Sequence, residues 1–170
     1  MPQQPARFPL IDGFEFAAAG GSVRGAWPVS VFPRLRGMLH DDSGSVEYAL
    51  RGGHDFHGRP QLELHATARL KLTCQRCLGA VECTLEPSST LLLAATQSEI
   101  DAEPITPEMP ERVVAHREMA VRDLVEDELL LALPVAPRHE DCSAQGRAAP
   151  HGRQRPFATL RGLLRGKSGH

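Results

Sequence analysis

Four side chains with soft ligand atoms lie in two short motifs that are far apart in the sequence. Cys74 and Cys77 form a Cys-x-x-Cys motif, and His139 and Cys142 form a His-x-x-Cys motif. Zinc prefers thiolate and imidazole ligands, and four of them complete a tetrahedral site. The two motifs therefore favour a structural Zn²⁺ site made of Cys74, Cys77, His139 and Cys142. Zinc is the only cofactor that the sequence suggests.

The same cysteines allow two other interpretations. Cys74 and Cys77 could be reduced thiols kept for packing, or a redox-active pair. A thioredoxin-like arrangement is disfavoured, because no βαβ pattern surrounds the motif. The remaining cysteine, Cys83, alternates in phase with Val81 and Leu85, so we interpret it as a small core residue.

Basic side chains that could contact RNA phosphates gather in two places. Arg69 and Lys71 lie on the polar side of a predicted strand, and Arg76 lies between the two cysteines. The second place is the segment 143–170, which has no acidic residue and contains Arg147, Arg153, Arg155, Arg161, Arg165 and Lys167. The alternatives are a solvated strand face and a solubilising tail. Phe157 in that tail could stack on a base or pack against the domain.

Acidic side chains do not form an evident catalytic group. Glu126, Asp127 and Glu128 are consecutive, and a helix turns by about 100° per residue, so they spread over an arc of about 200°. They cannot converge on one ion; Glu128 lies near the apolar edge of the helix, and the other two are expected to be solvated. His54, His57 and His65 are interpreted as scattered surface residues. Because no polar set converges, we expect no catalytic residue and no enzyme.

Alternation of apolar and polar residues predicts the elements that position these groups. Every second residue from Leu62 to Leu72 is apolar, which indicates a long strand, and residues 81–85 form its return strand. The Cys-x-x-Cys motif is then the tip of a hairpin. Further strands are predicted at 45–50, 89–95 and 112–116, and a helix at about 118–133, ended by Pro134. The expected fold class is α+β: an antiparallel sheet, open or partly closed, with this helix packed on it.

Composition predicts one soluble domain over residues 1–142, followed by a flexible basic tail. The chain is 41% hydrophobic and 24% charged, with a formal net charge of -2. Within the domain, residues 97–111 are rich in proline and acidic residues and are expected to form a mobile loop. Residues 1–33 suggest extended segments or short strands among glycine and proline, and residues 35–40 a strand or a turn. A short helix is expected near 156–165. A run of about 18 apolar residues is missing, as is a secretory signal, so we expect a cytoplasmic protein without a membrane span.

Two sequence blocks resemble the YceD family of bacterial and plastid proteins. The first is Cys-Gln-Arg-Cys-Leu (Cys74 to Leu78) after an alternating strand. The second is Val-Glu-Asp-Glu-Leu-Leu-Leu-Ala-Leu-Pro-Val-Ala-Pro (Val125 to Pro137), followed by His139 and Cys142. Arg-Pro-Phe-Ala-Thr-Leu (Arg155 to Leu160) is similar to the closing motif of the family. Order and spacing agree from about Ser45 to Leu164.

The resemblance implies a non-enzymatic role in accumulation or processing of large-subunit ribosomal RNA. The implied partners are this rRNA or a pre-ribosomal particle, and a ribosomal protein. Two other hypotheses stay open: an adaptor that docks a ribosomal protein or maturation enzyme through the acidic segment 99–111, and a thiol redox protein that uses Cys74 and Cys77.

Overall fold

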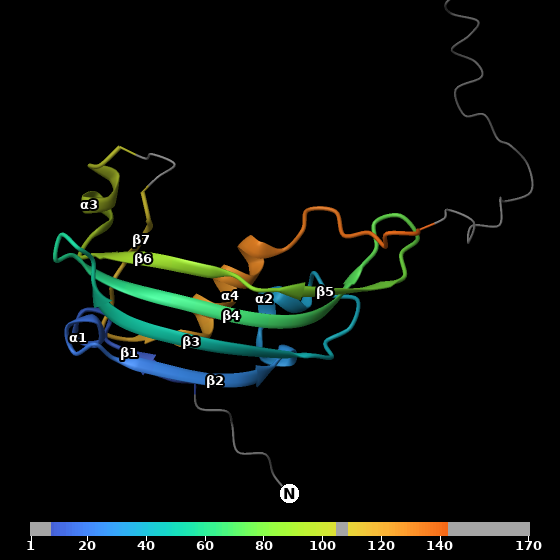
Figure 1. Cartoon of the computed structure of the whole chain (residues 1–170), viewed down its shortest axis with the longest axis horizontal. Coiled ribbons are helices and arrows are strands. Elements are labelled where there is room, and N and C mark those ends of the chain that lie inside the picture. The colour runs from blue at the N-terminus through green and yellow to red at the C-terminus, as the bar shows by residue number, and fades with distance from the viewer. Residues whose placement is uncertain (1–7, 105–108, 143–170) are drawn as a thin grey trace, which may run out of the picture.

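The centre of the molecule is an open six-stranded sheet (Figure 1). The computed structural model describes residues 8–104 and 109–142. The strands of the sheet are β2 (Ser22–Pro28), β3 (Ser45–His54), β4 (Pro60–Thr73), β5 (Ala80–Leu85), β6 (Ser88–Ala94) and β7 (Glu111–Val114). Their order is β2-β3-β4-β6-β7, and β5 pairs with the far half of β4, beyond the part that pairs with β6. All pairs are antiparallel except β6 and β7, which run parallel.

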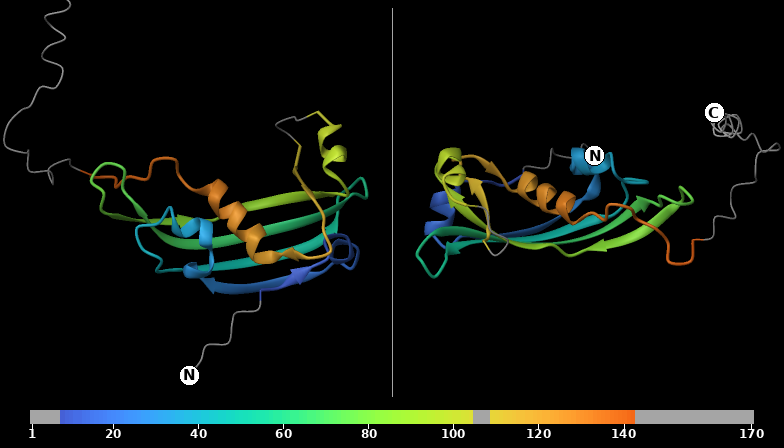
Figure 2. Two further views of the ribbon diagram at one scale, coloured as in Figure 1. Left: turned by 180° about the vertical axis from the view of Figure 1, so that it is seen from behind. Right: turned by 90° about the horizontal axis from the view of Figure 1, so that it is seen from above.

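Helices cover one face of this sheet and leave the other face open. In Figure 2, α4 crosses the covered face and α2 lies beside it. The helical segments are α1 (Gly13–Ala18), η1 (Val29–Val31), α2 (Pro33–Arg36), α3 (Gln97–Asp101) and α4 (Val121–Ala132). Two short strands, β1 (Leu10–Ile11) and β8 (Met119–Ala120), pair directly before α4. The α+β class with one main helix is thus confirmed, and of the two predicted forms of the sheet the open one is found.

The core forms where β4 meets α4. Alternate residues of β4 are buried, as the pattern predicted, namely Leu62, Leu64, Ala66, Ala68, Leu70 and Leu72. Val125 and Leu129 of α4 pack into the same core at 0% exposure. Burial of apolar side chains at helical spacing is the main stabilising contribution to a helix of this length. The hairpin that carries the cysteines is therefore anchored at the centre of the sheet.

The helix begins later than its periodicity predicted. Residues 119–120 form β8, paired with β1, so α4 starts at Val121 instead of residue 118. It ends at Ala132, two residues before Pro134, because a proline disfavours the helical conformation of the residue before it. Cys74 directly follows β4, the longest of the described strands. The segment after Ala132 turns toward it, because the helix has ended there.

Among the described residues before position 40, β2 agrees with the predicted extended segments or short strands, but two helices were not predicted. These residues form the edge strand β2 and the helices α1 and α2, and they supply Phe32 and Leu35 to the core at 0% exposure. Trp27 of β2 stacks on Tyr48 of β3 with ring centroids 4.1 Å apart. Such aromatic contacts add to the energy of burial.

The acidic segment 97–111 contains regular structure at both ends. It begins with α3 and ends at the start of β7, and Arg112 pairs with Glu103 at 2.5 Å. Residues 105–108 lie outside the described part of the chain, as does the predicted tail 143–170 with its short helix. Among the described helices, none has the length and apolar character needed to cross a bilayer.

Candidate metal centre

The hairpin tip between β4 and β5 presents two cysteines. The turn is closed by two backbone hydrogen bonds: Cys74 N–H donates to Gly79 O, and Leu78 N–H donates to Cys74 O, both at 2.9 Å. Leu78 has a φ of 63°, a left-handed conformation that is uncommon for a residue other than glycine. Cys74 is buried and Cys77 is exposed, so the two sulfurs lie at different depths of one turn.

The segment after α4 returns to this tip. Gln75 N–H donates a hydrogen bond of 2.9 Å to Pro137 O, which joins the turn to the chain that follows the helix. His139 and Cys142 then lie beside the two cysteines (Figure 1 shows the segment after α4 running to the β4–β5 turn). The structure therefore brings together the four residues that the sequence grouped only by type.

Distances within this cluster suit a tetrahedral metal site. The four ligand atoms all lie within 4.8 Å of one another. The Sγ atoms of Cys74 and Cys142 are 3.7 Å apart, and Cys77 Sγ is 3.5 Å from His139 Nδ1. Zn–S bonds of about 2.3 Å and Zn–N bonds of about 2.0–2.1 Å, at tetrahedral angles, separate two sulfurs by about 3.7 Å and a sulfur from a nitrogen by about 3.5 Å. The cluster could thus hold a metal ion.

A hydrogen bond orients the imidazole for this role. His139 Nε2 lies 2.7 Å from the backbone oxygen of Ala80, so Nε2 carries the proton and donates it. Nδ1, which faces Cys77, is then free to bind a metal. Metal-binding histidines commonly use their second nitrogen in this way, because the bond fixes both tautomer and ring orientation. The backbone oxygen of Ala80, the first residue of β5, therefore fixes the orientation of the His139 ring, which follows α4 in the sequence.

Two thiols of the cluster have opposite pKa shifts. Hydrogen bonds from the backbone of Cys77 and Arg76 to the sulfur lower the pKa of Cys74 to about 5, although burial acts against them. Burial raises the pKa of Cys142 to about 11, and the neighbouring sulfurs of Cys77 and Cys74 add to that rise. The hydrogen bond to Ala80 raises the pKa of His139. Metal ligands must be deprotonated, so Cys74 is prepared as a thiolate while Cys142 would release a proton on binding.

Comparison with known families connects this arrangement with a biological process. Residues 62–164 match the model of the family described as "Large ribosomal RNA subunit accumulation protein YceD". The chain belongs to the YceD family. The match starts within β4 and includes the cysteine hairpin, α4, His139 and Cys142. Among curated proteins, and among solved structures, nothing matches the chain.

This match confirms the resemblance to the YceD family. The structure confirms the sheet that the sequence predicted. Membership associates this chain with large-subunit ribosomal RNA, as the family's description does. The match also continues beyond Cys142 to Leu164, into the segment that we predicted to be a basic tail.

The three basic residues proposed from the hairpin lie on its surface. Arg69 and Arg76 are exposed, and Lys71 forms an ion pair with Asp41 at 3.5 Å. The six basic residues predicted to contact RNA from the tail lie outside the described residues: Arg147, Arg153, Arg155, Arg161, Arg165 and Lys167. Cys83 is half-buried on β5, apart from the metal cluster, as its position in phase with Leu85 predicted.

The prediction for the acidic triplet was wrong for one residue. Glu126, which we expected to be solvated, is 1% exposed, and it accepts hydrogen bonds from the backbone of Arg34 and Leu35. Helical periodicity identifies the face toward the sheet, but α4 also packs against α2, which comes from the N-terminal segment. Glu128 is buried near the apolar edge, as expected, whereas Asp127 is exposed and binds Arg34 at 2.6 Å.

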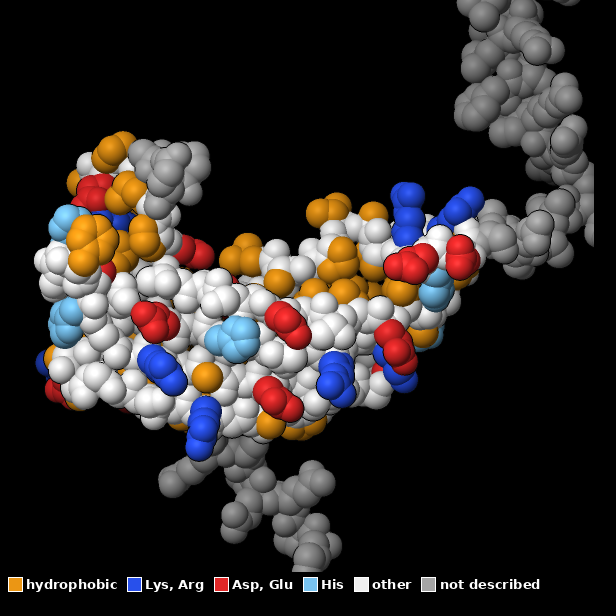
Figure 3. All heavy atoms as spheres, in the orientation of Figure 1, with side chains coloured by type: hydrophobic (Ala, Val, Ile, Leu, Met, Phe, Trp, Pro, Cys, Tyr) orange, Lys and Arg blue, Asp and Glu red, His pale blue; other side chains and the backbone are white. Residues whose placement is uncertain are grey.

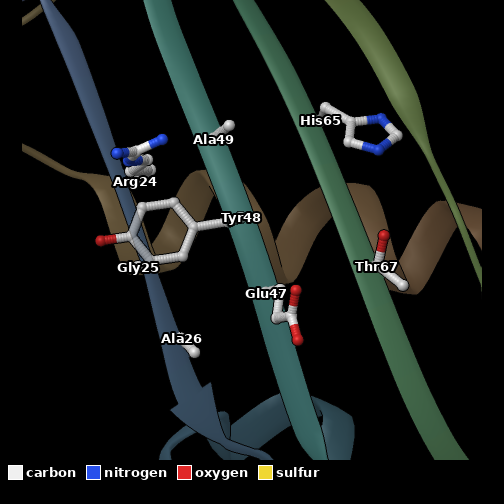
Figure 4. A pocket seen from close by; sticks show the side chains of 8 residues that line it. All are labelled: Arg24, Gly25, Ala26, Glu47, Tyr48, Ala49, His65 and Thr67. Carbon is white, nitrogen blue, oxygen red and sulfur yellow. The ribbon is translucent and has the colours of Figure 1, made fainter.

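A shallow hollow on the open face of the sheet was not predicted. Its volume is about 570 Å³, and side chains of three neighbouring strands surround it (Figure 4). The short side chains of Ala26 and Ala49 leave space between Arg24, Glu47 and His65. Sequence alternation indicated which residues of β4 face outward, but it gave no such indication for β2. The pairing of Arg24 with Ala49, and of Ala49 with His65, needed the strand register.

Proposed function

We propose that this YceD-family chain is a non-enzymatic ribosome-biogenesis factor that binds large-subunit rRNA or a pre-ribosomal particle in the cytoplasm. We further propose that Zn²⁺ occupies the cluster of Cys74, Cys77, His139 and Cys142. The observation that carries the zinc proposal is the cluster geometry, since the 3.7 Å between Cys74 Sγ and Cys142 Sγ and the 3.5 Å between Cys77 Sγ and His139 Nδ1 agree with tetrahedral zinc. Family membership supplies the connection with rRNA.

Zinc bound to this cluster would have a structural role. It would join the β4–β5 turn to the segment after α4, where few apolar residues are available for packing. Arg76 projects from the turn between two ligands, and Arg138 is exposed directly before His139. A closed four-ligand site would therefore hold two exposed guanidinium groups in a fixed relation, which reduces the entropy lost when they bind phosphates.

The open sheet face offers a second area for contact with RNA. It carries Arg24, Arg51 and Arg69, but Glu47 and Glu63 lie among them. Figure 3 shows basic and acidic side chains interspersed on this face. Mixed charge gives weaker attraction to any polyanion than a uniformly basic patch gives. We infer that the hairpin and the tail supply most of the phosphate contacts, and that acidic groups limit non-specific adhesion.

Salt dependence of RNA binding tests this proposal. The full-length protein is titrated with a transcript of large-subunit rRNA at several KCl concentrations, beside a small-subunit transcript of equal length. We expect preference for the large-subunit transcript and a log–log salt slope that becomes shallower by about 0.7–0.9 for each phosphate contact removed. The variants are Arg69→Ala and Arg76→Ala, and Arg117→Ala, an exposed arginine just before β8, is the control. Equal affinity for both transcripts, or affinity independent of salt, would contradict the proposal.

One observation also favours a thiol redox protein. The pKa of Cys74, lowered to about 5, is typical of reactive thiols. Against this alternative, Cys74 is 0% exposed, and its sulfur lies 3.7 Å from Cys142 within a set of four soft ligands. Reaction of the metal-free protein with a thiol reagent distinguishes the two, because a redox role requires fast modification of Cys74 that a metal role does not.

A further inference from the structure

An apolar groove lies between α4 and β7, the last strand of the sheet. Its volume is about 300 Å³, and its apolar walls come from α4 on one side and from β6 and β7 on the other, namely Leu124, Leu130 and Leu131 opposite Leu91 and Val113. Leu131 is 70% exposed. In Figure 3, hydrophobic side chains gather at the edge of the molecule where α4 ends. Single exposed apolar residues are normal, but a contiguous lined groove is typical of an interaction surface.

A buried carboxyl group without a cationic partner also lines this groove. Of the three consecutive acids of α4, Glu126 and Asp127 bind Arg34, whereas Glu128 lines the groove. Glu128 is 8% exposed, and it forms no ion pair with another described residue. Burial is the main cause that raises the pKa of Glu128, as expected for a carboxyl group that lacks a compensating positive charge.

Glu111 adds a second negative charge at the border of the groove. It is exposed, and within residues 8–104 and 109–142 it forms no ion pair. Its neighbour Arg112 pairs with Glu103 instead. The groove thus combines apolar walls with two carboxyl groups, those of Glu111 and Glu128, that can accept hydrogen bonds from an occupant.

This combination decides which occupant the groove suits. A purely apolar occupant would bury Glu111 and Glu128 without partners, which is strongly unfavourable for charged groups. RNA is disfavoured, because its phosphates would approach the two carboxylates. A second copy of the chain is also disfavoured, since a twofold interface would place the acidic groups of one copy against those of the other. The remaining chemistry is a polypeptide with apolar side chains and a positive charge.

We propose that the groove between α4 and β7 binds a segment of a partner protein in which apolar side chains accompany an arginine or lysine. The apolar side chains contact Leu124, Leu131 and Val113, and the positive side chain pairs with Glu128 and Glu111. The third acid of α4, which binds nothing charged in the described part of the chain, thereby obtains a partner. The inference does not rest on the proposed rRNA binding, because the groove contains neither a residue of the metal cluster nor a basic residue assigned to RNA.

Selection from a random peptide library tests the inference. Phage-displayed peptides are selected on immobilised full-length protein, and those recovered are synthesised and measured by fluorescence anisotropy against wild type and variants. We expect peptides in which arginine or lysine accompanies apolar residues. Their affinity should fall by about tenfold in Leu131→Ser and in Glu128→Gln, since a buried leucine and a hydrogen bond to a charged group each commonly contribute at least that factor.

Matched variants control for effects outside the groove. Val135→Ser removes a fully exposed apolar side chain that does not line the groove, and Glu86→Gln removes an exposed acid between β5 and β6. Both variants should bind the peptides like wild type. Glu128→Gln removes a buried charge, so it should stabilise the fold at pH values above the raised pKa of Glu128. Weaker binding by this variant at such a pH would therefore not come from unfolding.

Four results would overturn the inference. The first two are the recovery of no peptide whose binding depends on Leu131 and Glu128, and the recovery of groove-dependent peptides that lack arginine and lysine. A wild-type dimer that Leu131→Ser dissociates, seen by analytical ultracentrifugation, would assign the groove to a second copy of the chain. Weaker binding of an rRNA transcript by Leu131→Ser would assign it to RNA. The selection uses the protein alone, so failure of the proposed rRNA binding would leave its outcome unchanged.

Discussion

Glu126 accepts two hydrogen bonds from Arg34, a residue 92 positions earlier, through the backbone N–H at 2.7 Å and through the guanidinium Nε at 3.1 Å. It also accepts one from Leu35 N–H at 3.1 Å. The carboxylate therefore satisfies the first N–H groups of α2, which would otherwise lack partners beside the core. In this way the Glu-Asp-Glu sequence of α4 fastens the N-terminal segment to the YceD domain.

Removal of this carboxylate should strongly destabilise the protein. We expect Glu126→Ala to lower the free energy of unfolding by about 2–4 kcal/mol, since each buried unsatisfied group costs about 1–3 kcal/mol. Asp127→Ala removes the other acidic partner of the same arginine, but that pair is half-exposed, so we expect a loss below about 1 kcal/mol. Urea unfolding of both variants measures the difference. Equal losses would show that Glu126 has no special role.

Two adjacent glycines should respond differently to a methyl group. A Cβ at Gly52 would lie 2.4 Å from Phe16 O and 2.8 Å from Ala17 Cα, where α1 packs on β3, whereas a Cβ at Gly53 would meet nothing within 4 Å. We expect Gly52→Ala to cost about 1–3 kcal/mol, as overpacking does, and Gly53→Ala to change stability by less than about 0.5 kcal/mol. Thermal unfolding of the two variants makes the comparison. A tolerated Gly52→Ala would mean that α1 packs less closely than the structure shows.

Stability should depend on pH through Glu128. Burial raises the pKa of Glu128, only partly offset by a contact with Ser89, and repulsion by Glu111 and Asp127 adds to the rise. The folded state then binds this proton more tightly than the unfolded state, so the free energy of unfolding falls as pH rises from the ordinary value of 4.5 through the raised pKa. Glu128→Gln should therefore be more stable than wild type at pH 8, and the advantage should disappear below pH 4.5. Urea titrations at the two pH values check the sign, and a Gln variant that is less stable at pH 8 would refute it.

Local alternation predicted the parts of the fold in which one face of an element is buried. Residues 62–72 of β4 and the paired β5 lie where the pattern placed them, because the sheet has one covered and one open face. The short β7 was also found at 111–114, although its parallel pairing with β6 was not predicted. Parallel and antiparallel neighbours impose the same alternation on a strand, so the pattern alone does not distinguish them.

Contacts between segments that are distant in the sequence could not be predicted from local alternation. The burial of Glu126 depends on its contact with α2. The sequence of residues 33–36 does not indicate a helix that packs against α4. The metal cluster was predictable by type, since Cys-x-x-Cys and His-x-x-Cys together supply four ligands. The bonds from Gln75 to Pro137 and from His139 to Ala80, which bring the two motifs together, involve backbone groups that no side-chain pattern reveals.

The metal content of the freshly purified full-length protein, kept reduced, tests the central claim most directly. It should be measured for wild type, Cys74→Ser, Cys142→Ser and the control Cys83→Ser, whose thiol lies outside the cluster. The account predicts about one zinc per chain in wild type and in Cys83→Ser, and loss of that zinc in the other two variants. Wild-type protein without metal, or variants of Cys74 and Cys142 that retain it, would contradict the four-ligand site.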